Sequence, residues 1–274
     1  MRMHHAPLLG FLLAAGCFGS GLPDGGDDAI YGRAPDLGGP ICTGNNDGVI
    51  DRSELSFPLG ATVNYLFNPG GTTVAVNPDG VPGPDGPQWD LSSTAGDVRQ
   101  LVIEPVADKW YANDFPGATY ATLADVGSGL LGVFRVTDDA LLLMGFVSDE
   151  PKKTLLVYDH PVATVHFPIR QGDAWVTGAK ITNGTLGGTP FASTDTYAIS
   201  VDARGTAVLP YLTFQNTLRI RVELSQALPG GQNVSHIQLL FFHECYGELG
   251  RMVSLPGEKN GSFTTAAEFR RLAL

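Results

Sequence analysis

The chain has 274 residues, of which 43% are hydrophobic and 16% are charged, and its net charge at pH 7 is −11. The hydrophobic share excludes wholesale disorder, and the acidic balance argues against a nucleic-acid-binding protein, which normally carries a basic face. Gly (35) and Pro (19) make up about a fifth of the chain, against roughly an eighth in average proteins, which favours many short strands joined by turns over a helical bundle.

The N-terminus has the pattern of a lipoprotein signal peptide. One fixed charge, Arg2, precedes an apolar run over residues 6–16 that is too short to span a bilayer but suits a signal peptide. The run ends in LAAGC at 13–17, which resembles the bacterial lipobox, where the signal peptidase cuts before a cysteine that is then lipidated. We predict a signal peptide over 1–16 and lipidation at Cys17. The alternative is an ordinary secretory signal with a chance cysteine.

A lipidated Cys17 predicts a mature protein that acyl chains anchor to a membrane without spanning it. Residue 18 is Phe, not the Asp that retains some lipoproteins at the inner membrane, so we expect the outer membrane, at its periplasmic or its surface face. Residues 18–40 are rich in Gly, Pro and Asp. We therefore assign 17–40 to the lipidated cysteine and a flexible tether, and 41–274 to a single β-rich domain.

Lipidation of Cys17 leaves two further cysteines, Cys42 and Cys245. In an oxidising compartment these two are expected to form a disulfide. A rival interpretation makes His243 and Cys245 part of a metal site, because two residues at i and i+2 share one face of a strand. No CxxC or HxxxH motif supplies the remaining ligands of such a site.

Residues 43–54 resemble the twelve-residue loop of the EF-hand. Gly48 occupies the sixth position, where the loop turns sharply, and Thr43 replaces the usual first-position Asp. The loop has no helical flanks, since Pro40 precedes it and Pro58 follows it. It predicts a weak structural calcium site, with a Kd of about 10⁻⁴–10⁻³ M; the alternative is an ordered turn without an ion. The expected ligands are Thr43, Asn45, Asp47, Val49 through its carbonyl, Asp51 and Glu54.

From residue 60 onward, short apolar alternation bounded by turns predicts strands. The clearest is 218–224, where apolar residues alternate with Arg219, Arg221 and Glu223 as in a half-buried antiparallel strand. Residues 197–201, a turn at 202–205 and residues 206–209 predict a hairpin. The tail, 264–274, fits a helix or a final strand. Further strands are expected at 62–67, 101–106, 131–136, 141–147, 154–158 and 237–242.

Several short motifs occur in a fixed order: CTGNNDGVID at 42–51, WDLS at 89–92, DFPGA at 114–118, FP at 167–168 with Gly172 and Trp175, GTAVLP at 205–210 and NTLRI at 216–220. Together they resemble a family of uncharacterised exported bacterial lipoproteins of the myxobacterial type and, more distantly, secreted proteins of gliding bacteria. The resemblance implies a curved antiparallel sheet, as a half-barrel or a β-sandwich. It implies no activity.

Catalytic motifs are absent from the sequence, which has no GxSxG, HExxH or P-loop and no GxGxxG in a strand-to-helix context. The paired Asp138 and Asp139 do not form a convincing acid and base. We expect the histidines at 160, 166, 236 and 243 to be structural. The three tryptophans at 89, 110 and 175 fit core packing better than a sugar-stacking platform.

We therefore expect a non-enzymatic, lipid-anchored β-domain with a structural or ligand-binding role, for which the sequence specifies neither a small-molecule nor a protein partner. One alternative is a carrier or chaperone that holds a lipophilic ligand in a half-barrel cavity. Another is an enzyme acting on cell-wall or polysaccharide substrates.

Overall fold

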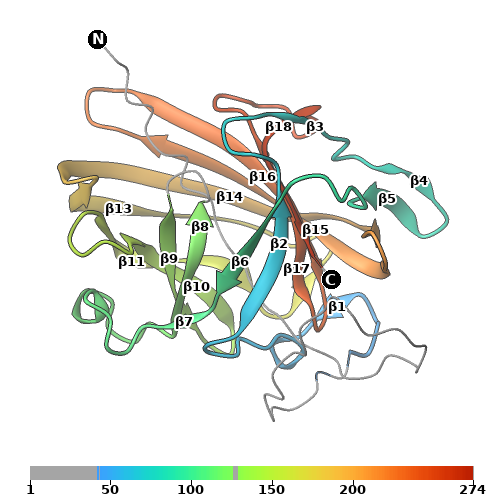
Figure 1. Ribbon diagram of the computed structural model, residues 1–274, viewed down its shortest axis with the longest axis horizontal. Helices are drawn as coiled ribbons and strands as arrows, with labels where there is room; N and C mark the ends of the chain where they lie inside the picture. The colour runs from blue at the N-terminus through green and yellow to red at the C-terminus, as the bar shows by residue number, and fades with distance from the viewer. Residues whose placement is uncertain (1–41, 43, 126–128, 274) are drawn as a thin grey trace.

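The computed structural model describes residues 42, 44–125 and 129–273 (Figure 1). These residues form β-strands and two single-turn 3-10 helices, η1 (Arg52–Glu54) and η2 (Ala112–Asp114), so the expected all-β class is confirmed. No helix within these ranges is long and apolar enough to cross a membrane. The expected signal peptide, the lipidated Cys17, the tether at 17–40 and the proposed calcium ligand Thr43 lie outside the described residues.

One large sheet dominates the fold and curls until it is nearly closed (Figure 1). Its two end strands in spatial order, β6 and β7, are consecutive in the chain with only Ile103 between them. The segment 97–105 therefore pairs with β2 through β6 and with β8 through β7, so the two ends of the strand order meet in one stretch of chain. The strands in spatial order are β6 (Asp97–Val102), β2 (Thr62–Phe67), β18 (Thr265–Leu272), β17 (Gly247–Ser254), β16 (Asn233–His243), β15 (Thr213–Ala227), β14 (Thr189–Val208), β13 (Ala174–Leu186), β11 (Leu155–His166), β10 (Ala140–Ser148), β9 (Leu130–Val136), β8 (Tyr120–Asp125) and β7 (Glu104–Pro105).

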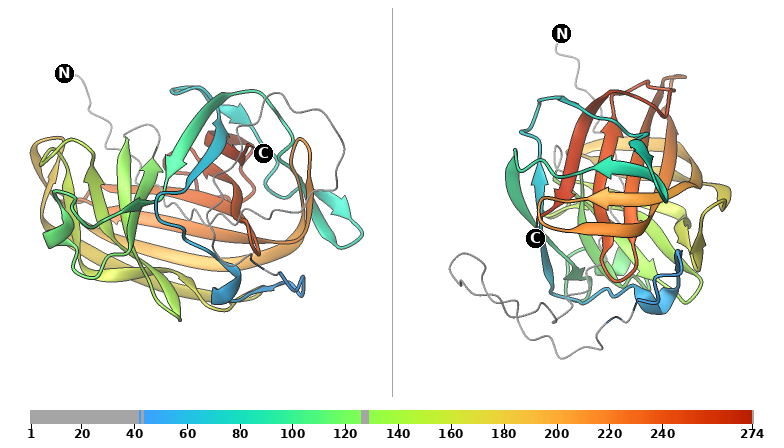
Figure 2. Two further views of the ribbon diagram at one scale, coloured as in Figure 1. Left: turned by 60° about the horizontal axis from the view of Figure 1, so that its bottom comes forward. Right: turned by 90° about the vertical axis from the view of Figure 1, so that its right-hand side faces the viewer.

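The curled sheet encloses the inner core, which lies between the wall made by β8–β10 and the wall made by β14–β16 (Figure 2). A second cluster, the outer core, packs against the other face of β16 and β17. The two clusters follow from the alternation of side chains along a strand. Leu240 and Phe242 face the inner core, whereas Leu239 and Phe241 face the outer core, and all four are at most 1% exposed.

The strand expected at 218–224 is confirmed within β15. Its apolar positions Leu218, Ile220, Val222 and Leu224 are at most 3% exposed and belong to the inner core. Ladder pairs with β14 on one side and β16 on the other place the strand near the middle of the sheet. The period-2 pattern therefore marked the buried face of a central antiparallel strand.

The segment between β2 and β6 adds strands to the large sheet outside its main order and packs against the outer core. It contains β3 (Val74–Ala75), which pairs with β18, and the hairpin of β4 (Val81–Gly83) and β5 (Gly86–Asp90). β5 lies parallel to the end of β14, unlike the antiparallel pairs of the large sheet. Two glycines permit the close backbone approach: a Cβ on Gly205 would lie 2.0 Å from the carbonyl oxygen of Pro87, and a Cβ on Gly86 would lie 2.4 Å from that of Arg204.

The hairpin predicted at residues 197–209 is wrong. β14 runs without a break from Thr189 to Val208, and the chain reverses only after it, before β15. Register shifts between Val201 and Ala203 and between Gly205 and Ala207 absorb the polar residues that resemble a turn. Such bulges bend a strand without ending it. The tail is strand β18, so the strand alternative holds there.

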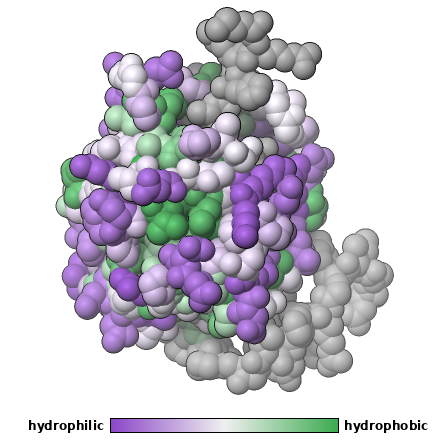
Figure 3. Space-filling model, turned by 90° about the vertical axis from the view of Figure 1, so that its left-hand side faces the viewer, coloured by the Kyte–Doolittle hydropathy of each residue, from purple (hydrophilic) through white to green (hydrophobic). Residues whose placement is uncertain are grey.

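A small two-stranded sheet lies beside the large one and consists of β1 (Val49–Ile50) and β12 (Ile169–Arg170). The surface is mostly polar: on the face drawn in Figure 3, hydrophilic residues surround a limited apolar area. The exposed large apolar side chains lie on three strands and in three loops, one of which holds both Tyr211 and Leu212. They are Leu59, Val81, Val98, Val176, Tyr211, Leu212 and Leu255.

Candidate functional site

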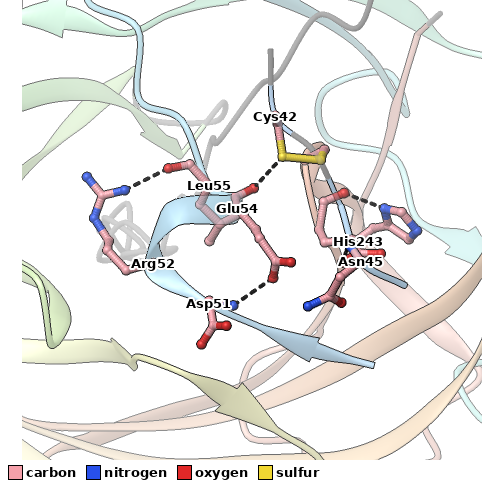
Figure 4. Close-up of a disulfide and its surroundings, with 9 residues drawn as sticks. Cys42, Asn45, Asp51, Arg52, Glu54, Leu55 and His243 are labelled. Carbon is pink, nitrogen blue, oxygen red and sulfur yellow. Dashed lines mark hydrogen bonds between the residues drawn. A yellow bond between two sulfur atoms is a disulfide. The ribbon is translucent and has the colours of Figure 1, made fainter. Parts of the chain in front are cut away.

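A disulfide joins Cys42 to Cys245, which lie 203 positions apart in the chain. Cys245 lies in the turn between β16 and β17. The backbone amide of Cys245 donates to the carbonyl oxygen of Glu54 at 2.9 Å, and Sγ of Cys42 lies 3.2 Å from the same oxygen (Figure 4). The predicted disulfide is therefore confirmed. It fastens residues 42–54, the disulfide loop, to a turn of the large sheet.

The rival metal site at His243 and Cys245 is wrong, because the sulfur of Cys245 is bonded to Cys42. His243 Nδ1 donates to the carbonyl oxygen of Glu244 at 2.5 Å, and its ring lies 5.1 Å from that of Phe214 between centroids. Burial lowers the pKa of His243 below its usual value. His243 is thus a neutral packing residue at pH 7.

The calcium-loop pattern folds into turns in which side-chain oxygens accept backbone amides. Asn45 Oδ1 accepts from the amide of Asp47 at 2.9 Å, and Asp47 Oδ1 accepts from that of Val49 at 2.7 Å. Glu54 Oε2 accepts from the amide of Asp51 at 2.9 Å (Figure 4). These bonds shape the disulfide loop and employ three of the side chains that the pattern assigned to calcium.

The surroundings of this loop differ from those of an EF-hand. Gly48 has a φ of +81°, as the sharp turn at the sixth position requires. The next two residues form β1, and the loop ends in the single turn η1. The described residues contain no group of three or more His, Cys, Asp or Glu side chains arranged to hold a metal ion.

Glu244 is a carboxylate that the sequence pattern missed, because it comes from the turn between β16 and β17. Its Oε2 accepts a hydrogen bond from the amide of Asn45 at 3.1 Å. Glu54 and Glu244 are both 6% exposed. Burial raises the pKa of Glu54, and the negative charge of Glu244 raises it further. The loop thus brings together two carboxylates that repel each other in a dry setting.

A surface cavity of about 560 Å³, here called the β5 groove, lies where the β3–β5 segment crosses the outer face of β17 and β18. Met252 and Phe269 are buried at its base, and Val81 on β4 is 54% exposed at its side. The residues that line it are Ala75, Val76, Asn77, Gly80, Val81, Gln88, Asp90, Ser92, Val208, Met252 and Phe269.

One wall of the β5 groove, the turn at residues 77–80, is fixed by Arg219 on β15. Arg219 Nη1 and the indole nitrogen of Trp89 both donate to the carbonyl oxygen of Pro78, at 2.6 and 3.0 Å. The same guanidinium binds both carboxylate oxygens of Asp202, at 2.7 and 3.0 Å. A bidentate pair of this kind holds an arginine in one orientation, so this wall is rigid before any ligand binds.

Arg271 on β18 fixes the segment that follows β5. Its guanidinium donates to the carbonyl oxygens of Ser93, Ala95 and Phe269 and lies 4.5 Å from the centre of the Phe269 ring. Arg271 is 2% exposed. Carbonyl oxygens of the backbone therefore satisfy the donors of this buried cation, and these bonds hold residues 93–95 to β18.

Asp90 is the one ionisable side chain among the residues that line the β5 groove. Its Oδ1 accepts from both the amide and the hydroxyl of Ser92, at 2.9 and 2.6 Å. Both hydrogen bonds lower the pKa of Asp90, and the bond from the Ser92 hydroxyl has the larger effect. No hydrogen bond from the described residues reaches Oδ2. The groove therefore presents a fixed negative charge with one oxygen available.

The interior also contains a network of buried charges. Arg251 Nη2 lies 2.5 Å from Glu248 Oε2, and Arg270 Nε lies 3.3 Å from Glu248 Oε1. All three side chains are at most 1% exposed. Glu268, whose Oε1 lies 3.0 Å from Arg270 Nε, supplies a second negative charge, so that opposite charges compensate one another, as a dry interior requires.

The remaining candidates from the sequence do not meet. The three tryptophans belong to different apolar clusters, and Trp89 is completely buried. His160 pairs with Asp159 at 2.9 Å, and the ring of His166 packs against Trp175 at 4.9 Å between centroids. Buried His236 lies 2.8 Å from the amide nitrogen of Gln238.

Comparison with protein-family models, with curated proteins and with solved structures gives no match to this chain. One sequence pattern points to the groove residues. In WDLS at 89–92, Asp90 and Ser92 alternate with Trp89 and Leu91, which face the outer core.

Proposed function

We propose that this chain is a non-enzymatic, exported β-domain that is anchored to the outer membrane through Cys17 and binds a small-molecule ligand in the β5 groove. The lipobox pattern at 13–17 and the tether at 17–40 support the anchoring. The disulfide supports export, because such bonds persist in oxidising compartments. The groove supports binding, since it is a concave site with apolar walls and a few polar groups.

The observation that carries the binding proposal is that the wall at residues 77–80 is fixed in advance. Arg219 holds this turn through the carbonyl of Pro78, and Arg271 holds residues 93–95, which follow the lining residue Ser92. A preorganised site loses little conformational entropy when a ligand binds. A cavity of about 560 Å³ also lies within the ordinary range for small-molecule sites.

Native mass spectrometry of the protein isolated from its own host tests this function. We expect a small molecule to accompany the wild-type protein and to be lost from Val81→Trp, which fills the groove from the exposed side of β4. Val98→Trp is the matched control, because Val98 is also exposed, on β6, and does not line the groove. Equal retention of the molecule by all three proteins would place it elsewhere and contradict the proposal.

A second candidate function, a carrier for a lipophilic ligand, is favoured by two hydroxyls on β8. Tyr120 and Thr122 are 0% exposed, and neither hydroxyl has a hydrogen-bond partner among the described residues. Tyr120 belongs to the inner core, and Thr122, two positions later, shares its face. A buried hydroxyl without a partner costs roughly 1–3 kcal/mol, which the polar group of an enclosed ligand would offset.

The carrier function is tested by organic-solvent extraction of the isolated protein, followed by mass spectrometry of the extract. A carrier is expected to yield a lipid in stoichiometric amount and to yield less from Tyr120→Phe. A lipid-free extract from correctly folded protein would reject the carrier and leave the groove proposal standing.

We also propose a weak structural calcium site at the disulfide loop. Its support is the pair of buried carboxylates, Glu54 and Glu244, whose repulsion a divalent cation would relieve. Asn45, whose amide binds Glu244, belongs to the predicted ligand set. Glu244 would add a charged ligand to the predicted set, in which Asp47, Asp51 and Glu54 carry the charges.

A further inference from the structure

We propose that the β5 groove binds a small organic cation, in which a primary ammonium group is carried on a short apolar chain or ring. This inference rests on the proposed function, which makes the groove the ligand site, and adds the chemical class of the ligand. It is argued from charge, hydrogen-bonding capacity and the apolar walls.

The charge of the groove is negative and unbalanced within its lining. Asp90 is the one ionisable residue there, and its Oδ2 has no hydrogen-bond partner among the described residues. Of the two arginines described above, Arg219 is paired with Asp202, and the donors of Arg271, behind the ring of Phe269, bind backbone carbonyls. The whole chain is also acidic, with a net charge of −11. A cation is therefore attracted over distance and has a specific partner on arrival.

The polar groups of the lining offer acceptors to a compact donor. Asn77 uses its Nδ2 to bind the carbonyl oxygen of Gly80 at 2.9 Å, which leaves its Oδ1 as an acceptor. Gln88, two residues before Asp90 on β5, contributes a carboxamide to the same lining. An ammonium group has three donors and no acceptor. It therefore matches a carboxylate oxygen and neighbouring carboxamide oxygens better than an anion or a neutral alcohol does.

The rest of the groove favours an apolar body on that cation. Val81, Val208, Met252 and Phe269 are lining residues without hydrogen-bonding side chains, apart from the weak thioether acceptor of methionine. A sugar would instead call for an exposed aromatic face, and the tryptophan of this region, Trp89, is 0% exposed. The combination of one carboxylate with aliphatic and aromatic walls selects an amphiphilic ammonium compound.

The test is an NMR titration of the folded domain with three probes of equal length: hexylammonium chloride, sodium hexanoate and 1-hexanol. We expect saturable shifts of the backbone amides of Gln88, Asp90 and Val208 with hexylammonium. We expect hexanoate and hexanol to bind at least about tenfold more weakly, a factor that corresponds to loss of one charge-assisted interaction. Raising the salt concentration should weaken hexylammonium binding, because exposed charges are screened.

Asp90→Asn should reduce hexylammonium affinity about tenfold and abolish the preference over hexanol, since it keeps the shape and removes the charge. Asp85→Asn is the matched control, because Asp85 is an exposed carboxylate in the β4–β5 turn and does not line the groove. Equal affinity for hexylammonium and hexanol, or an Asp90→Asn variant that binds as the wild type does, would overturn the inference.

The two proposals can fail separately. If a host molecule is lost from Val81→Trp but hexylammonium does not bind, the groove is a ligand site and the cation inference is wrong. If neither the host molecule nor any of the three probes responds to Val81→Trp, the groove is not a binding site and both proposals fall.

Discussion

Asp195 on β14 is fully buried and lies within a small network of hydroxyl and amide groups. Tyr158 Oη donates to its Oδ2 at 2.7 Å, and Gln226 Nε2 donates to its Oδ1 at 3.0 Å. The hydroxyls of Tyr158 and Tyr197 are 2.5 Å apart. Tyr158 lies in a bulge of β11, because Val157 and Val162, five positions apart, pair with residues of β10 that are only two positions apart. Burial raises the pKa of Asp195, although its hydrogen bonds oppose the shift.

This raised pKa predicts how the free energy of unfolding depends on pH. The folded state binds the proton of Asp195 more tightly than the unfolded state does. The stability that this proton contributes is therefore complete below pH 3.8, the ordinary pKa of Asp, and is lost as the pH rises through the pKa of the folded state. Asp195→Asn removes this dependence. Urea denaturation from pH 3.5 to 8 should therefore show a flatter profile for Asp195→Asn than for the wild type. The exposed Asp138→Asn, between β9 and β10, should keep the wild-type slope; identical slopes in all three would contradict the assignment.

The carboxylate pair of the disulfide loop makes a prediction about calcium. At about ten times the Kd, binding stabilises the folded state by about 1.4 kcal/mol, which for a domain of this size raises the melting temperature by about 3–6 °C. We expect this rise with about 5–10 mM CaCl₂, given a Kd of about 10⁻⁴–10⁻³ M. Glu54→Gln should abolish the rise and should stabilise the calcium-free protein, because it removes a charge that is disfavoured first by burial and further by Glu244. No change of the wild-type melting temperature in calcium would reject the site.

At the scale of elements, the disulfide is a covalent cross-link between the N-terminal loop and the turn that follows β16. Closing a loop of 203 residues lowers the entropy of the unfolded chain, and the chain-entropy model gives about 5 kcal/mol as an upper value. The double variant Cys42→Ser/Cys245→Ser should therefore lose about 2–5 kcal/mol of unfolding free energy in urea. Wild-type protein treated with a reductant is the control and should match the variant. If the unfolding curve of the variant coincided with that of the oxidised wild type, the disulfide would not be stabilising.

The elements also show which features the sequence could predict. Period-2 alternation identified β15 because both neighbours of that strand are in the sheet and one face is buried. The same reasoning failed at 202–205, where Asp, Arg and Gly resemble a turn. There Asp202 is bound by Arg219 on the neighbouring strand, and bulges absorb the extra residues. Local composition cannot reveal a partner that is supplied by another strand.

The candidate site depends still more on contacts between distant residues. Asp90 and Ser92 lie in a short motif that the sequence displays, but Met252 and Phe269 reach the same groove from β17 and β18. Likewise Glu244 meets the disulfide loop only because the disulfide and the turn after β16 bring it there. Residues separated by more than 150 positions come together through the register of the sheet. That register depends on pairing across the whole molecule and cannot be seen in any one segment.

At the scale of the whole molecule, we propose two tasks for the three cysteines. Cys42 and Cys245 are bonded to each other, so Cys17 is the cysteine that is left for lipidation. Cleavage before Cys17 would remove Arg2 and make the net charge of the mature protein −12. The tether at 17–40 would then separate an acidic domain from the membrane surface, which is itself anionic in many bacteria. Charge repulsion would keep the β5 groove in solution while the acyl chains hold the protein in place.

Cys17→Ala tests this arrangement directly. The variant lacks the thiol that receives the lipid, so we expect it to leave the membrane fraction after a carbonate wash, whereas the wild-type protein stays. Intact-mass analysis should show acyl chains on the wild type alone. Because Cys17 lies outside the β-domain, the variant should retain the disulfide and its melting temperature. A Cys17→Ala protein that stays in the membrane fraction as fully as the wild type would mean that something other than a lipid holds it there.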